Sequence, residues 1–323
     1  DITVSILDVN DNAPVFTSTA TFNAAENQTS IGTVTATDAD TTGSITFSVS
    51  GAELSITSGG ILTFVTAPDY ESKSSYSATV TATDGTNSTT QDITVSVTNL
   101  NDNAPVFTSS ATFSAAENQT VIGTISASDA DGDAVIYSIN GADAASISIN
   151  SSSGVLAFIS APDYETKTSY ALTATASDGV NSINQSITIN ISDLNDNSPV
   201  FTSSATFSAA ENQTSIGTVT ATDADATDSI TFSISGTELS ITSAGVLTFA
   251  SAPDYETTTS LTATVTATDG INATTQDVTV SVTDVNDNSP VFTSSATFSV
   301  AENQANIGTV TTSDADNGNT ISY

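Results

Sequence analysis

The clearest chemical pattern in this sequence is a set of carboxylates that recur at fixed spacings. An Asp-Ala-Asp triplet begins at residues 38, 129, 223 and 314, and an Ala-Glu-Asn-Gln string places a glutamate at 26, 117, 211 and 302. Successive copies of both motifs are 91, 94 and 91 residues apart. Carboxylate oxygens are the preferred ligands of hard cations such as Ca²⁺. The spacing therefore indicates cation binding at equivalent places along the chain.

Three further motifs recur in register with these two. Pro-Asp-Tyr-Glu begins at residues 68, 162 and 253, Asp-Gly at 84, 178 and 269, and Asn-Asp-Asn at 10, 101, 195 and 286. A single Asp-Gly or Asn-Asp-Asn is usually a turn, because short polar side chains bond the local backbone. Here 28 of the 36 acidic residues fall in the motifs and the linkers, so turns alone do not explain the pattern. The string 129–133 also resembles the start of an EF-hand loop, but Ala134 and Asn140 stand where that loop needs Gly and Glu.

The composition excludes several other chemistries. The chain has no Cys and no His, its only basic residues are Lys73 and Lys167, and its formal net charge is −34. Nucleic-acid binding needs a basic surface, and zinc sites and Ser-His-Asp triads need Cys or His. Paired carboxylates can hydrolyse glycosides, but the cation pattern already accounts for them, so we expect no enzyme. No apolar run approaches the roughly 18 residues of a membrane helix, so we expect no insertion of this stretch into a membrane.

The segments between the motifs predict an all-β fold. With 37% hydrophobic residues the chain can fold despite its charge, and apolar residues alternate with polar ones as in half-buried strands. In the third copy of the repeat we expect short strands at 206–208, 218–222, 229–233, 239–242, 246–249, 261–268 and 277–283. About seven strands in about 100 residues are typical of an immunoglobulin-like Greek-key β-sandwich. Three extra residues in the second copy, between Asp129 and Pro162, fit a loop or hairpin.

The spacing also sets the expected domain bounds, since a period near 91 residues suits a small domain. Complete repeats are predicted at 13–103, 104–197 and 198–288. Residues 1–12 are predicted to be the last strand and linker of a preceding repeat, and residues 289–323 to be a partial repeat.

In kind and order these motifs resemble those of the cadherin repeat. The Ser-, Thr- and Ala-rich composition with few basic residues is similar to that of bacterial cadherin-like tandem repeats in large surface or secreted proteins. The resemblance implies tandem seven-stranded sandwiches in an elongated rod, located outside the cell or at its surface. It also implies calcium as the cofactor, with about three ions at each complete junction between successive repeats.

In the family, the ligands come from the repeat before each linker, from the linker, and from the repeat after it. For linker 193–197 the resemblance implies Glu117, Asp163, Glu165, Asp193, Asn195, Asp196, Asn197, Asp223, Asp225 and Asp269. For linker 99–103 it implies Glu26, Asp69, Glu71, Asn99, Asn101, Asp102, Asn103, Asp129, Asp131 and Asp178. For linker 284–288 it implies Glu211, Asp254, Glu256, Asp284, Asn286, Asp287, Asn288, Asp314 and Asp316. For linker 8–12 it implies Asn10, Asp11, Asn12, Asp38, Asp40 and Asp84.

The junctions are not equivalent in these ligand sets. Linkers 8–12 and 284–288 have incomplete sets, so we expect fewer ions there. Asn99 stands where the other linkers have Asp, and the missing charge predicts weaker calcium binding at linker 99–103.

The predicted function is that of a calcium-rigidified extracellular protein in cell adhesion or in surface or biofilm attachment. Its expected partners are calcium and either other copies of itself or a cell-surface ligand. The alternative is a structural spacer or filament-forming fibre subunit without adhesive specificity of its own. The chain has no Trp, so the Trp exchange of vertebrate classical cadherins cannot operate in this stretch.

Overall fold

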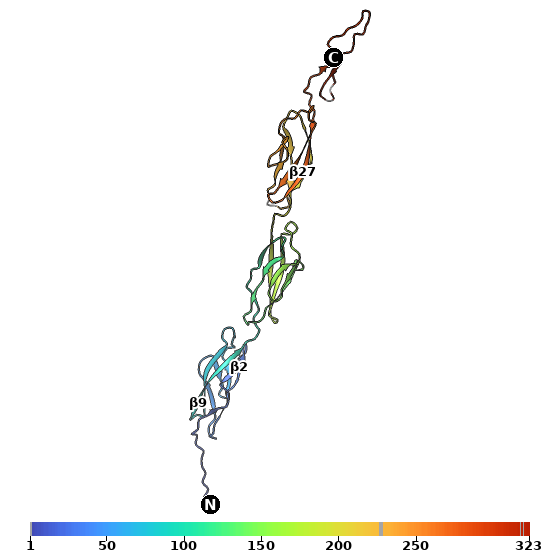
Figure 1. Cartoon of the computed structure of the whole chain (residues 1–323). Helices are drawn as coiled ribbons and strands as arrows, with labels where there is room; N and C mark the ends of the chain where they lie inside the picture. Colours follow the sequence, from blue (N-terminus) through green and yellow to red (C-terminus); the bar gives the residue numbers. More distant parts are fainter. Residues whose placement is uncertain (1, 226–228, 317, 319) are drawn as a thin grey trace. The chain divides into compact units, whose positions relative to one another are not determined.

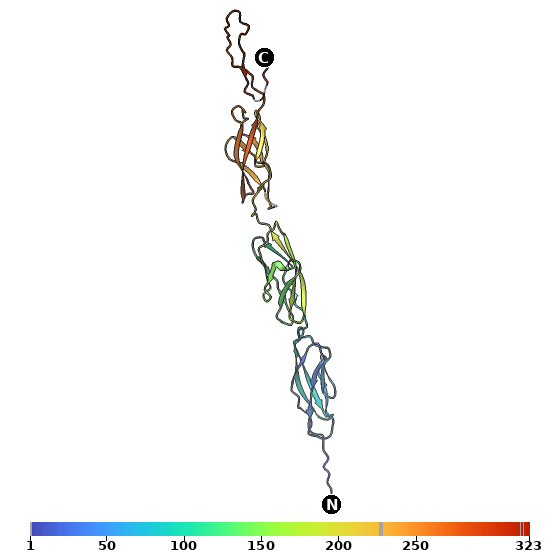
Figure 2. The same cartoon turned by 90° about the vertical axis from the view of Figure 1, so that its right-hand side faces the viewer.

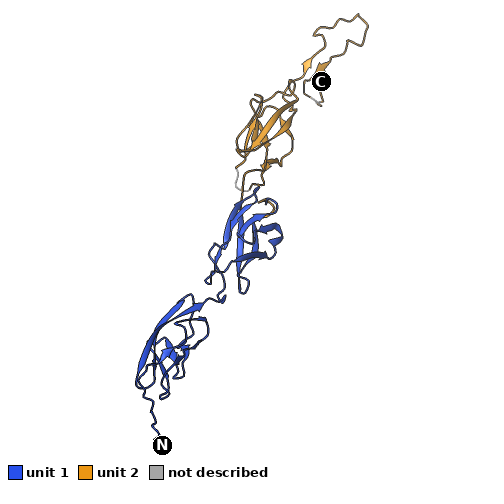
Figure 3. Cartoon of the chain, turned by 60° about the horizontal axis from the view of Figure 1, so that its bottom comes forward, with its two compact units in different colours: residues 1–162, 169–190 blue, residues 163–168, 191–323 orange. Residues whose placement is uncertain are grey.

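The structure is a computed structural model that describes residues 2–225, 229–316, 318 and 320–323. The chain forms two compact units, one of residues 1–162 and 169–190 and the other of residues 163–168 and 191–323 (Figure 3). Both units are built from β-strands, and one 3₁₀ turn is the only helical element in the described part of the chain. The all-β prediction is confirmed.

The first predicted repeat is coloured blue to cyan in Figures 1 and 2. Its strands are β1 (Val15–Phe16), β2 (Thr21–Ala25), β3 (Ser30–Thr33), β4 (Ala36–Thr37), β5 (Thr46–Val49), β6 (Leu54–Ile56), β7 (Ile61–Phe64), β8 (Ser75–Thr83) and β9 (Ser88–Thr98). Strands β2, β9, β8 and β5 form a four-stranded sheet in that order, and β3, β7 and β6 form a three-stranded sheet. These two sheets supply the seven strands of the predicted sandwich, and β1 and β4 form a short additional pair.

The second and third predicted repeats contain the same three sheets. The second has β10 (Val106–Phe107), β11 (Thr112–Ala116), β12 (Val121–Thr124), β13 (Ala127–Ser128), β14 (Ile136–Asn140), η1 (Ala144–Ser146), β15 (Ile147–Ile149), β16 (Val155–Phe158), β17 (Ser169–Ser177) and β18 (Ser182–Ser192). The third has β19 (Val200–Phe201), β20 (Thr206–Ala210), β21 (Ser215–Thr218), β22 (Ala221–Thr222), β23 (Thr231–Ile234), β24 (Leu239–Ile241), β25 (Val246–Phe249), β26 (Ser260–Thr268) and β27 (Ala273–Thr283). The last segment has β28 (Val291–Phe292) and β29 (Thr312–Ser313).

Alternation of apolar and polar residues explains how the sheets pack. In β9, Ile93, Val95 and Val97 are buried, and the residues between them are exposed. Successive side chains of a strand point to opposite faces, so one face of the four-stranded sheet is apolar. That face packs against Leu62 and Phe64 of the three-stranded sheet in one buried cluster. Each buried side chain of this size stabilises the sandwich by about 1.5–3 kcal/mol.

The pairing of β2 with β9 positions the acidic motifs. The two strands run parallel and side by side (Figure 1). In their register Ala25 pairs with Thr98. The next residue along β2 is Glu26, and the next residue along β9 is Asn99, the first of the linker. The register therefore places the glutamate beside the linker, and the Glu26 N–H donates to the Thr98 carbonyl at 3.3 Å. Strands β20 and β27 pair in the equivalent register.

Several strand bounds in the third repeat differ from the sequence prediction. The expected strand 218–222 is two strands, because the register shifts between Ser215 and Gly217 in β21 and the chain then leaves β25 to pair with β19 through β22. Strand β27 begins four residues before the expected residue 277, because its polar first residues still pair with β26. Strand β23 begins at Thr231 rather than 229, and residues 226–228 lie outside the described residues. Strand β19 has two residues, too few for a periodic pattern.

The extra length of the second repeat lies partly at η1. This turn occupies the connection between β14 and β15, while the first repeat connects β5 to β6 with residues 50–53 alone. A loop therefore takes up the extra residues there, as the sequence led us to expect.

Candidate metal centres at the linkers

The last asparagine of each linker is bonded to the second aspartate of the next Asp-Ala-Asp motif. The backbone N–H and the side-chain Nδ2 of Asn103 donate to Oδ2 and Oδ1 of Asp131, both at 2.8 Å. The same pair of bonds, at 2.7–3.0 Å, joins Asn12 to Asp40, Asn197 to Asp225 and Asn288 to Asp316. Two bonds to one carboxylate fix its orientation. Each linker is therefore attached to the repeat that follows it by direct protein contacts.

The first aspartate of the Asp-Ala-Asp motif has one carboxylate oxygen that accepts no hydrogen bond in three of the described repeats. Oδ1 of Asp129 accepts from the Asp131 N–H at 3.0 Å. Oδ2 of Asp129 is buried and has no hydrogen-bond partner among the described residues, and the same holds for Oδ2 of Asp38 and Asp223. A buried carboxylate oxygen without a partner is costly unless a cation pairs with it. Its recurrence in three repeats fits a metal ligand.

A buried glutamate contacts linker 99–103 and another contacts linker 284–288, each from the repeat before the linker. Glu26 is 2% exposed and accepts from the Tyr70 N–H at 2.8 Å and the Leu100 N–H at 2.7 Å. Glu211 is 3% exposed and accepts the two equivalent bonds at 2.7 and 2.8 Å. Glu117, the corresponding residue of the second repeat, is also 3% exposed. In the first and third repeats the glutamate thus ties the Pro-Asp-Tyr-Glu turn to the linker.

The asparagine that follows this glutamate has a left-handed backbone. The φ values are 60–65° at Asn27, Asn118, Asn212 and Asn303. Asparagine is one of the few residues other than glycine that adopts this conformation readily. The side chain of Asn27 donates to Asp102, and that of Asn212 donates to Asp287 at 2.6 Å. At these two linkers, an asparagine of the preceding repeat therefore donates a hydrogen bond to the linker aspartate.

These contacts gather carboxylates from different motifs. One oxygen from each residue lies within 4.8 Å of the others in the sets Glu26, Glu71 and Asp102; Asp38, Asp40 and Asp84; and Glu165, Asp196 and Asp225. Two carboxylates about 4 Å apart repel by about 1 kcal/mol in water, and by more where water is excluded. Calcium binds six to eight oxygens from carboxylates, amides and carbonyls, so this donor set fits calcium.

The electrostatics of linker 99–103 reflect the same crowding. Loss of water around Glu71 raises the pKa of its carboxyl above the ordinary value, and the charges of Glu26 and Asp131 add to the rise. Burial also acts to raise the pKa of Asp131, but hydrogen bonds from the Asn103 side chain and backbone outweigh it and hold that pKa below its ordinary value. Neighbouring carboxylates therefore differ in how readily they ionise.

Comparison with known proteins agrees with this arrangement. Residues 19–98 match the family model of the cadherin domain. Human cadherin EGF LAG seven-pass G-type receptor 1 is 34% identical over 249 residues, which are 69% of this chain and 8% of the relative. Human protocadherin Fat 4 is 35% identical over 219 residues, which are 62% of this chain and 4% of the relative. This is a chain of cadherin repeats. It spans less than a tenth of the length of these curated relatives.

Solved cadherin structures have the same fold. Mouse cadherin-23 EC22-24 matches with a TM-score of 0.68 and 26% identity, over 85% of this chain and 100% of that chain. The extracellular domain of protocadherin gammaB4 matches with a TM-score of 0.74 and 28% identity, over 97% of this chain and 58% of that chain. The cis-dimer structure of protocadherin gammaB7 EC3-6 matches with a TM-score of 0.70 and 26% identity, over 95% of this chain and 85% of that chain.

The aspartates of the three Pro-Asp-Tyr-Glu motifs accept hydrogen bonds from residues that follow them in the chain. Asp69 and Asp163 follow the prolines of their motifs and accept bonds from Ser72 and Thr166, and these bonds lower the pKa of both carboxyls. The equivalent Asp254 accepts from the Glu256 N–H at 3.0 Å. Asn99 is at the start of its linker, where Nδ2 donates to the Asp131 carbonyl at 2.8 Å.

The sequence prediction missed a set of asparagines that contact the linkers. Nδ2 of Asn181 donates to Asn101 Oδ1 at 3.0 Å and to the Asn103 carbonyl at 3.1 Å. Asn272 donates to Asn195 Oδ1 at 2.7 Å, and Asn87 donates to the Asn12 carbonyl at 2.8 Å. The signal was available, because all three stand three residues after the aspartate in Asp-Gly-x-Asn. Asp133, whose carboxylate lies within 4.8 Å of those of Asp129 and Asp131, was also missed.

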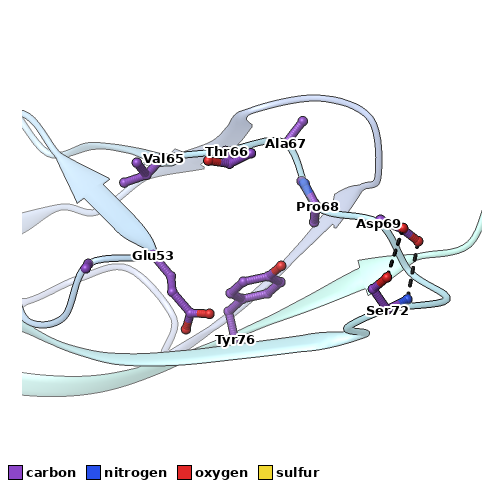
Figure 4. Close-up of a pocket in the computed structure, with 9 residues that line it drawn as sticks. Glu53, Val65, Thr66, Ala67, Pro68, Asp69, Ser72 and Tyr76 are labelled. Carbon is purple, nitrogen blue, oxygen red and sulfur yellow. Dashed lines mark hydrogen bonds between the residues drawn. The ribbon is translucent and has the colours of Figure 1, made fainter.

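A cavity of about 340 Å³ lies beside the Asp69 turn of the first repeat (Figure 4). The Tyr76 ring forms part of its wall, with Glu53 close by, and Ser72 donates to Asp69 from its N–H and its hydroxyl. Lys73 Nζ is 2.5 Å from Glu53 and 4.4 Å from the centre of the Tyr76 ring. Both carboxylates of the cavity therefore already have partners within the protein.

Proposed function

We propose that this chain is part of an extracellular cadherin-repeat protein whose successive repeats are held together by calcium, and that it acts in cell adhesion or in attachment to a surface or biofilm. The observation that carries the proposal is that carboxylates from several motifs come together at one linker. A frame of hydrogen bonds positions them: those that Glu26 accepts and those that Asn103 donates to Asp131. Buried Oδ2 atoms without donors at Asp38, Asp129 and Asp223 support a cation as their partner.

At linker 99–103 the residues that would hold calcium come from both neighbouring repeats. Glu26, Asp69 and Glu71 precede the linker in the sequence, and Asp129, Asp131 and Asp178 follow it. The linker adds Asn101, Asp102 and Asn103. Calcium would supply positive charge that all of these oxygens share. Its binding then orders the linker, because metal binding and local ordering are coupled.

Calcium titration of the whole chain tests the binding. We expect saturable binding after the chelator has been removed, at about three ions for each complete junction. Glu53→Gln is the matched control, since it removes one charge from the Glu53–Lys73 ion pair and leaves the linker motifs intact. Absence of binding in calorimetry and in equilibrium dialysis would overturn the proposal.

Small-angle scattering tests whether calcium stiffens the chain. Repulsion between the carboxylates at each linker should loosen the chain in chelator, and calcium should reduce its flexibility. Equal maximum dimension and flexibility in calcium and in chelator would contradict the rigidifying role. Glu53→Gln should respond to calcium as the wild type does.

Adhesion and a spacer role differ in whether the chain associates. Protocadherin gammaB7 EC3-6, one of the structural relatives, was solved as a cis-dimer, which supports self-association of this chain. The close similarity of the repeats favours a spacer or a fibre subunit, since a specialised binding repeat is expected to diverge. Beads coated with the chain should aggregate in calcium and disperse in chelator if it is adhesive. Beads that stay dispersed in both would favour the spacer.

The proposed location is outside the cell or at its surface, where calcium is abundant. The matching structures of protocadherins gammaB4 and gammaB2 are of extracellular domains, which supports this location. In the described part of the chain, no helix is long and apolar enough to cross a membrane.

A further inference from the structure

Linker 99–103 lacks one carboxylate that the other linkers have. Asp8, Asp193 and Asp284 begin the other three linkers, and Asn99 begins this one. The Asn99 side chain lies at the Asp-Ala-Asp motif of the second repeat, because its Nδ2 donates to the Asp131 carbonyl at 2.8 Å. The charge is therefore missing next to Asp131.

A different carboxylate lies next to the same residue. One oxygen of Asp133 is within 4.8 Å of one oxygen each of Asp129 and Asp131. Gly132 has a φ of +82°, a backbone conformation that favours glycine, and this turn folds Asp133 back toward Asp129. The Asp133 N–H also donates weakly to Asp129 Oδ1, at 3.4 Å.

Asp133 lies beside the same kind of cation ligand as the first aspartate of the motif in the first and third repeats. Oδ2 of Asp129 is buried and has no hydrogen-bond donor among the described residues. Lys73 and Lys167 are the only basic residues in the chain, and Lys73 is paired with Glu53. A metal ion is the partner that fits such an oxygen beside two further carboxylates.

The position two residues after the Asp-Ala-Asp motif varies together with the first linker residue. In the three repeats whose preceding linker begins with Asp8, Asp193 or Asp284, this position is Thr42, Thr227 or Gly318, respectively. In the repeat whose preceding linker begins with Asn99, it is Asp133. Asp228, three residues after the motif in the third repeat, lies outside the described residues. With Asp133 included, linker 99–103 has eight carboxylates, the number that the motifs give linker 193–197.

We propose that Asp133 is a calcium ligand of linker 99–103 that replaces the charge lost at Asn99. The inference rests on the calcium binding proposed above. It implies that this junction binds calcium about as tightly as linker 193–197, rather than more weakly as its motif alone predicts.

The test is hydrogen–deuterium exchange of the whole chain over a calcium titration, which reports each linker separately. In the wild type, residues 99–103 and 193–197 should become protected at similar calcium concentrations. Asp133→Asn, which keeps the size of the side chain, should raise the midpoint at 99–103 by about three- to tenfold and leave 193–197 unchanged. Asn99→Asp in the Asp133→Asn background should restore the midpoint. Asp92→Asn, a charge removed from β9, is the matched control.

The three ways in which this test can fail are distinguishable. If no linker is protected by calcium, the proposed function is wrong and this inference falls with it. If the linkers are protected but Asp133→Asn behaves like Asp92→Asn, only the role of Asp133 is wrong. If the Asp133→Asn effect appears but Asn99→Asp does not reverse it, the replacement of one charge by the other is wrong.

Discussion

Linkers 99–103 and 284–288 share one hydrogen-bond frame and differ in charge. In both, a buried glutamate accepts two backbone N–H groups, and an asparagine binds both oxygens of the Asp-Ala-Asp carboxylate. The first linker residue is the neutral Asn99 in one and the charged Asp284 in the other. Two residues after the Asp-Ala-Asp motif the difference is reversed, with the charged Asp133 in one and Gly318 in the other. The frame therefore does not depend on where each charge stands. The same hydrogen bonds are therefore compatible with two different sets of charges.

The largest effect should come from removing the buried glutamate. Glu26→Ala removes the acceptor of the Tyr70 and Leu100 N–H groups, and each of these hydrogen bonds to a charged group contributes about 1.5–3 kcal/mol. Glu211→Ala should cost a similar amount in the third repeat. Chemical denaturation measures both, and each variant should lose calcium protection only at its own linker.

Glu53→Ala is the control for these two variants. Its side chain is 57% exposed and pairs with Lys73, so the free energy of unfolding should change by about 0.5 kcal/mol or less. If Glu26→Ala changes stability no more than this control, the buried glutamate is not part of the frame.

A smaller effect is expected at the asparagine that binds Asp131. Asn103→Ala removes the part-buried Nδ2 bond to Asp131, which contributes about 1.5–3 kcal/mol, and an exposed Nδ2 bond to Asp102, which contributes less. The backbone bond to Asp131 is kept. The Asp131 carboxylate should then be less well oriented, so the calcium midpoint at 99–103 should rise. Asn288→Ala should have the same effect at 284–288. An unequal response would mean that the two frames differ despite their matching bonds.

The smallest effect is expected at the asparagines that the motifs did not identify. Asn181→Ala removes two neutral hydrogen bonds to the linker, each contributing about 0.5–1.5 kcal/mol. The linker should exchange hydrogen faster in chelator, with little change once calcium is bound. Asn272→Ala tests the same contact at linker 193–197, where it bonds Asn195. Faster exchange in calcium as well would contradict a role confined to the calcium-free state.

The sandwich and much of the frame were predictable because they follow from repeated motifs. The alternation of apolar and polar residues predicted the long strands. The parallel pairing of β2 with β9 brings the glutamate that follows β2 to the linker that follows β9. Strand bounds were less predictable where short strands change sheets, as at β21 and β22. The contacts of Asn181 with the linker and the position of Asp133 beside Asp129 and Asp131 were missed for different reasons. Asn181 belongs to a recurring Asp-Gly-x-Asn string, but its partner Asn101 is 80 residues earlier in the chain, so the string alone does not identify the contact. The residues equivalent to Asp133 are Thr42, Thr227 and Gly318, so no acidic motif recurs there.

The parallel pairing of β2 with β9 has a consequence for folding. Thr21 pairs with Thr94, so each sandwich closes only when distant parts of the chain meet, which makes folding slow. The neighbouring strand β11 has the sequence TFSAA, one residue different from the TFNAA of β2, so it can compete for the same edge of β9. During synthesis β2 is made first and β11 only after β9, which favours the correct partner. Refolding of the complete chain removes that order, so strand exchange between neighbouring repeats is the expected error.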